Sequence, residues 1–151
     1  MIKIFLMSEK IKSLLNSVGL SQAQFSTLFP AVTVEGDDQL SYLKHLDAYM
    51  ESLVIDEIDY FSNHRINTII LIRFLNDDDF SLYEPEIFDI LKSYLVHKAL
   101  IFRTKKAIER IKKDVEVVYM ASSFYETWLG VNDFDDRRDL RITWAEQQLK
   151  G

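Results

Sequence analysis

The sequence predicts an all-α protein, a single helical domain over residues 1–151 built as a bundle of five to seven helices with one long central helix. Glycine and proline are scarce, with four and two residues in the chain, and no Asn-Gly or Asp-Gly pair occurs. Sheets joined by tight turns need such residues at positive φ. Apolar residues recur at three- and four-residue steps instead, which is typical of amphipathic helices.

The first 30 residues predict two short helices. A helix over residues 8–18 has Ser8 as its candidate N-cap, and Gly19 ends it. Ser21 caps a second helix, which Pro30 stops.

A longer helix is expected next. Residues 31–38 form a connection that has room for a brief strand, and Asp37 or Asp38 then caps the helix. Its apolar positions recur at three- and four-residue steps from Leu40 to Phe61.

Two apolar segments leave the choice between helix and strand open. Residues 64–75 contain a run of four aliphatic residues, for which periodicity cannot separate a buried strand from a buried helix. The scarcity of glycine favours a helix there. Residues 114–121 are rich in β-branched side chains, which interrupt the helical pattern.

One long helix around residues 86–112 is expected to form the spine of the bundle. Residues 76–85 are interpreted as an acidic loop, with Pro85 suited to the first turn of the helix that follows. An apolar stripe then continues from Ile87 to Leu129. A last amphipathic helix, capped by Asp133, Asp135 or Asp136, is expected to follow. The dense group of aromatic residues in this third of the chain is interpreted as core that holds this helix, and a groove for a partner is the alternative.

Charge is distributed unevenly along the chain, whose net charge is −6. Residues 35–97 hold 14 acidic residues against four basic ones, whereas residues 98–113 hold seven basic residues against Glu109 alone. The simplest interpretation of the basic segment is a solvated helix face that pairs with the protein's own acidic helix. The alternative is a docking patch for phosphate or for an acidic protein, and the acidic half is a candidate surface for a basic partner. The candidate partner-binding residues are Lys98, Lys105, Lys106, Lys112, Lys113, Asp56 and Asp59.

The stretch Gly19-Leu20-Ser21-Gln22 resembles the turn and second helix of helix-turn-helix repressors of the Cro/C1 type. In that family this stretch ends one helix and caps the next, with the glutamine near a DNA phosphate. The resemblance covers about 20 residues, within 8–30, and implies a recognition helix that follows. Residues 31–38 depart from the pattern, because they supply three acidic residues where phosphates would be met.

Several chemistries have no signature in the sequence. The absence of cysteine excludes disulfides and thiolate sites, and the chain contains neither a glycine-rich phosphate loop nor a Gly-x-Ser-x-Gly motif. His45, His64 and His97 lie far apart, and His97 falls in the apolar stripe, where a hydrogen-bonded core histidine is the usual role. No metal or cofactor is therefore predicted, and the chain is not expected to be an enzyme.

We expect a non-catalytic binding or regulatory protein, of the kind represented by inhibitors, immunity proteins and chaperones. It would dock a charged helical surface onto another protein of complementary charge. Two alternatives remain: a DNA-associated regulator that uses residues 8–30 and 98–113, and a helical enzyme with an unrecognised site. The lack of a long apolar run or of a signal peptide predicts a cytoplasmic protein without a membrane partner, and self-association stays open.

Overall fold

The protein is mostly helical. The structure, a computed structural model, describes residues 2–32, 37–66 and 68–150, without the side chains of residues 3–5. Within these residues the elements, in chain order, are α1 (Ile2–Val18), α2 (Gln22–Leu28), α3 (Asp37–Ser62), β1 (Thr68–Arg73), α4 (Asp77–Tyr83), α5 (Pro85–Leu91), α6 (Tyr94–Arg110), β2 (Asp114–Tyr119), α7 (Ser122–Asn132) and α8 (Arg138–Lys150).

A small parallel sheet corrects the all-α prediction. β1 pairs with β2 in register from Thr68 with Asp114 to Arg73 with Tyr119. The helix favoured for residues 64–75 is therefore wrong, and residues 114–121 hold a second strand. Both faces of β1 are covered by other elements. The sequence of such a strand is a continuous aliphatic run, which periodicity cannot distinguish from a segment of buried helix.

The predicted spine over residues 86–112 is also two elements rather than one. α5 stops at Lys92, which adopts a left-handed conformation at φ 63°, and the Ser93 hydroxyl caps α6 by accepting a hydrogen bond from Leu95 N at 3.1 Å. α6 ends at Arg110, and Lys112, at φ 60°, turns the chain into β2. The residues at these breaks are polar and lie between the apolar positions of the stripe. The spacing of the apolar residues therefore does not reveal where one helix ends and the next element begins.

Local capping explains where α2 and α4 begin. Ser21 and Gln24 form the capping box of α2, which confirms the predicted cap. The acidic loop expected at residues 76–85 is wrong, because Asn76 caps a helix there by accepting a hydrogen bond from Asp79 N at 2.8 Å. α1 begins at Ile2, well before Ser8. The brief strand considered for residues 31–38 falls largely on 33–36, outside the described residues.

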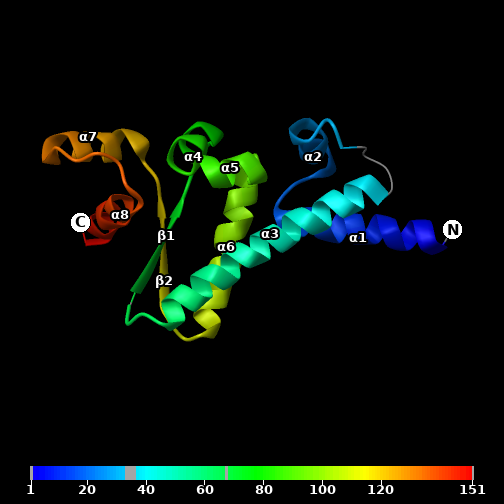
Figure 1. Cartoon of the computed structure of the whole chain (residues 1–151), viewed down its shortest axis with the longest axis horizontal. Coiled ribbons are helices and arrows are strands. Elements are labelled where there is room, and N and C mark those ends of the chain that lie inside the picture. The colour runs from blue at the N-terminus through cyan, green and yellow to red at the C-terminus, as the bar shows by residue number, and fades with distance from the viewer. Residues whose placement is uncertain (1, 33–36, 67, 151) are drawn as a thin grey trace.

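The helices are arranged on both sides of the sheet. Figure 1 shows α1 running beside α3 at one end of the molecule, α6 crossing α3, and α7 and α8 at the other end. Ile69 and Leu71 of β1 pack with Ile108 of α6, whereas α8 packs on the sheet from the other side. The core runs through most elements, with large fully buried side chains at Phe25, Leu43, Met50, Phe74, Phe80 and Tyr125.

Gly19 is required where α1 meets α6. Its φ is +84°, and an added Cβ would lie 2.9 Å from the carbonyl oxygen of Leu95 and 3.0 Å from the Cβ of Ala99. The substitution Gly19→Ala should lower the free energy of unfolding by about 2 kcal/mol, because it adds left-handed strain to a backbone clash. Urea titration followed by circular dichroism measures the change.

Gly130 provides the matched control, because an added Cβ there meets nothing within 4 Å. Gly130→Ala lies inside α7 and should be neutral or stabilising by up to about 1 kcal/mol. Equal destabilisation by the two substitutions would contradict the close approach of α1 to α6.

Candidate binding cleft

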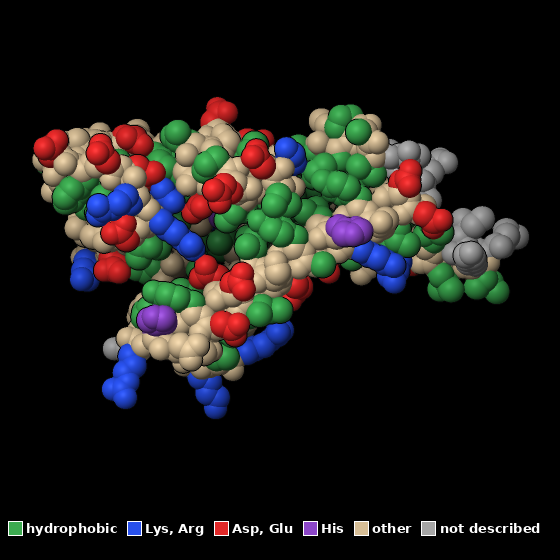
Figure 2. Space-filling view, in the orientation of Figure 1, with side chains coloured by type: hydrophobic (Ala, Val, Ile, Leu, Met, Phe, Trp, Pro, Cys, Tyr) green, Lys and Arg blue, Asp and Glu red, His purple; other side chains and the backbone are tan. Residues whose placement is uncertain are grey.

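A cleft of about 870 Å³ opens along β1, between α3 on one side and α8 on the other, with α6 at its base. Figure 2 shows it as a hollow with hydrophobic side chains inside and charged side chains at its edge. The apolar lining comes mainly from Leu53, Phe61, Ile66, Ile70, Leu71, Ile72, Phe74, Ile87, Leu100, Ile101 and Ile142. Its volume lies in the range usual for ligand-binding sites.

The topology of the sheet creates this cleft. β2 pairs with one edge of β1, and no residue of β2 lines the cleft. The opposite edge of β1 therefore borders the space between α3 and α8. Arg138 of α8 and Glu57 of α3 form an ion pair at 2.9 Å that joins the two walls.

A buried arginine fixes α8 beside the cleft. The side chain of Arg141 is 7% exposed, and its guanidinium pairs with Asp136 at 2.7 Å and with Glu84 at 3.3 Å. It also lies over the ring of Tyr83 at 5.6 Å. Because a buried charge must be paired, these contacts hold the start of α8 against α4 and α5.

The rim of the cleft carries an excess of negative charge. Its lining contains five acidic residues, Asp56, Glu57, Glu84, Asp139 and Glu146, against Arg138 and Arg141. Both arginines, with Glu57, Glu84 and Asp139, are engaged in ion pairs. Asp56 and Glu146 are exposed and form no salt bridge with another described residue, so they remain available to a cationic ligand.

His97 lies in the apolar wall of the cleft. Its ring centroid lies 5.0 Å from that of Phe74 and 4.6 Å from that of Phe80, and its Nδ1 has no hydrogen-bond partner among the described residues. Burial, with a smaller effect of the charge on Arg73, lowers the pKa of His97 to about 4. The ring is therefore neutral at physiological pH. The sequence correctly places His97 in the core, but its expected hydrogen bond is not found among the described residues.

The polar groups that line the cleft are mainly carboxylates at its rim, and none of them bonds to Nδ1 of His97 within the described residues. These carboxylates belong to α3, to α8 and to Glu84 at the junction of α4 with α5. No group of three potential metal ligands occurs among the residues that the structure describes. An apolar interior with a charged rim is instead typical of a site that binds.

The structure separates the predicted partner-binding residues. Asp56 lines the cleft, whereas Asp59 is exposed elsewhere on α3. The basic segment does not form one continuous helix face, because α6 ends at Arg110, before Lys112. Lys106 lies over the ring of Phe102 at 4.6 Å, and Lys113 donates a hydrogen bond to the carbonyl of His64 at 3.0 Å. None of the five predicted lysines lines the cleft.

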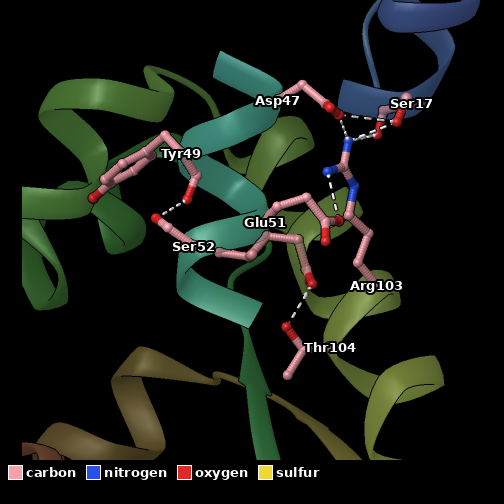
Figure 3. A network of polar contacts seen from close by, with 8 residues as sticks. Ser17, Asp47, Tyr49, Glu51, Ser52, Arg103 and Thr104 are labelled. Atoms are coloured by element: carbon pink, nitrogen blue, oxygen red, sulfur yellow. Dashed lines mark hydrogen bonds and ion pairs between the residues drawn. The ribbon is translucent and has the colours of Figure 1, made fainter. Parts of the chain in front are cut away.

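Arg103 shows that part of the basic segment is structural. Figure 3 shows its guanidinium reaching from α6 to Asp47 and Glu51 of α3 and to Ser17 of α1. The ion pairs measure 2.5 Å to Asp47 and 3.2 Å to Glu51. At this residue the interpretation that the basic segment pairs with the protein's own acidic helix is confirmed.

The helix-turn-helix resemblance coincides with α1 and α2, whose apolar residues Leu15, Val18 and Phe25 lie in the core. Gln22, the counterpart of the phosphate-binding glutamine, accepts a hydrogen bond from the buried Gln39 at 2.8 Å. The next helix in the described chain is α3, which begins with Asp37 and Asp38 and buries its apolar face against the core. An acidic first turn is repelled by phosphate.

No protein-family model matches the chain, and no curated protein is recognisably similar to it. Among the described helices, none combines the length and the apolar character required to span a bilayer.

Sequence reasoning missed the wall formed by α8. Arg138, Arg141 and Glu146 line the cleft, whereas the sequence directed attention to the aromatic residues of this region and not to these charged ones. One signal was present, since Arg141 lies between Leu140 and Trp144 on the face that the helix buries. An arginine on a buried face predicts paired carboxylates nearby.

The neutral state of His97 predicts an acid-sensitive fold. Below pH 6.5 the unfolded chain binds a proton that the folded chain does not take up until about pH 4. Stability should therefore fall as the pH drops through this window, by up to about 3 kcal/mol from this residue. Urea unfolding of the wild type and of His97→Phe at pH 7 and pH 4 measures the difference, and the variant should lose less stability.

His45 offers the control for this experiment, because it is exposed on α3. His45→Gln should follow the wild-type dependence on pH. If the wild type and His97→Phe lose equal stability between pH 7 and pH 4, His97 binds its proton equally well in the folded and unfolded chains, and the prediction is wrong.

Proposed function

We propose that this protein is a non-catalytic binding protein that docks a basic segment of another protein in the cleft between α3 and α8. The observation that carries the proposal is the combination of an apolar interior with a rim whose unengaged charges, Asp56 and Glu146, are both acidic. Complementary charge at a rim guides association and selects partners, while apolar burial supplies most of the affinity.

The two other functions have less support. A DNA-associated regulator would need residues 8–30 to present a recognition surface, but Gln22 is bound to Gln39 and the next described helix starts with two aspartates. A helical enzyme would need polar groups that converge on a reacting atom, and His97 has no carboxylate partner within the described residues. The proposal is therefore a binding function rather than a catalytic one.

Site-specific photo-crosslinking in the native host tests the proposal. A photoreactive amino acid at Thr68, which lines the cleft and is exposed, should give a crosslinked protein of discrete mass. The same group at Ser13, exposed on α1, should not. The double variant Asp56→Lys with Glu146→Lys should reduce the Thr68 crosslink about tenfold, because it replaces attraction at the rim with repulsion.

Charge reversal on the basic segment is the matched control. Lys105→Glu with Lys112→Glu changes two charges outside the cleft and should leave the Thr68 crosslink unchanged. If this variant removes the partner and the cleft variant does not, docking occurs through the basic surface and the cleft proposal is wrong. Absence of a crosslink at Thr68 in all proteins would reject it as well.

A further inference from the structure

The direction of the backbone groups in β1 follows from one hydrogen bond. The carbonyl of Arg73 accepts from Met120 N at 2.8 Å, so the backbone groups of Arg73 point towards β2. Residues along a strand alternate in the edge to which their N–H and C=O groups point. Leu71 and Ile69 therefore also bond to β2, whereas Ile70 and Ile72 direct their N–H and C=O groups away from β2.

These outward groups border the cleft without a partner from the fold. Ile70 and Ile72 both line the cleft and are half-buried. Outside the β1–β2 ladder, no backbone hydrogen bond from the described residues reaches either of them. Backbone groups removed from water are normally paired, so a ligand that supplies matching donors and acceptors gains free energy here.

We propose that the partner binds as an extended strand, which adds to the free edge of β1 and makes the sheet three-stranded. This inference rests on the proposed function and specifies how the partner is held. An added strand would exchange backbone hydrogen bonds with Ile70 and Ile72, which is the mode of peptide recognition at open sheet edges. β1 has six residues, which span about 20 Å at about 3.3 Å each.

The chemistry of the cleft defines the partner segment. Side chains of an added strand alternate between its two faces, so one set would meet the apolar residues on α3 and α6 and the other would meet Ile142 on α8. The acidic Asp56 and Glu146 at the rim favour lysine or arginine at the ends of the segment. The expected ligand is therefore a short β-forming sequence with an apolar centre and basic flanks.

The outer edge of β2 is a weaker candidate for strand addition. Its outward-directed residues, by the same alternation, are Val115, Val117 and Tyr119, and none of them lines the cleft. Tyr119 is 53% exposed. The edge of β1 combines free backbone groups with apolar walls, and both are needed to hold a strand.

Peptide selection followed by backbone methylation tests the strand mode. Random 12-residue peptides displayed on phage are selected on the full chain and counter-selected on the Asp56→Lys, Glu146→Lys variant. The best peptide is then synthesised in two forms. One form is N-methylated at the odd-numbered central residues, and the other at the even-numbered central residues. Only one parity directs its N–H groups to β1, so one form should lose affinity at least about 30-fold while the other stays within about threefold of the parent.

A substitution on the protein side gives an independent test. Ile70→Pro removes an N–H group that faces the cleft and leaves the ladder to β2 intact, because proline is tolerated where the N–H is not used in the sheet. It should weaken the selected peptide at least about 30-fold, whereas Ile70→Val should have little effect. Circular dichroism checks the fold of both variants, and the methylated peptides remain decisive should the proline variant unfold.

The possible outcomes separate this inference from the proposed function. If a partner crosslinks at Thr68 but both methylation patterns weaken the peptide equally, strand addition is wrong, while docking in the cleft still holds. Failure to select any peptide also overturns the strand mode. If sedimentation shows a dimer that Ile70→Pro dissociates, a second copy of the chain occupies the edge, and the proposal of a foreign strand is wrong.

Discussion

The parallel pairing of β1 and β2 is the constraint on which the arrangement of the other elements depends. Parallel strands cannot be joined by a tight turn, so the chain must cross from the end of β1 back to the start of β2. Here α4, α5 and α6 make that crossing, and α6 covers one face of the sheet. Because the sheet has two strands within the described part of the chain, each of them keeps one open edge there. On the side of β1, that edge becomes the cleft.

The second wall of the cleft depends on polar contacts as well as on burial. Trp144 and Ala145 bury α8 in the core, whereas Arg141 sets its position through Asp136 and Glu84. Asp136 is itself oriented by a hydrogen bond from the hydroxyl of Tyr125. The buried charge thus joins the segment before α8, α7 and the junction of α4 with α5. Such a network fixes one geometry because every member must stay paired.

Much of the helical content could be predicted from the sequence, and the sheet could not. Ser21, Pro30 and Pro85 mark boundaries through local chemistry, which a single sequence displays directly. The segments around Ile70 and Val117 became strands because they meet each other across a separation of nearly 50 residues. Such pairing is a tertiary effect, which the periodicity of a single segment does not indicate. The cleft was hidden for the same reason, since its walls come from helices far apart in the chain.

The separation of charge along the sequence also has a tertiary explanation. Arg103 uses part of the basic segment to hold α6 against α3 and α1, and Arg138 and Arg141 neutralise acids near the cleft. Arg103 and Arg141 form their ion pairs at largely buried positions, whereas Arg138 is exposed. Asp56 and Glu146 lie outside these pairs and beside apolar surface. Exposed like charges raise repulsion within the folded chain, and a basic ligand relieves it. Asp56 and Glu146, which form no ion pair with another described residue, are thus the charges that the proposed cationic partner would meet at the cleft.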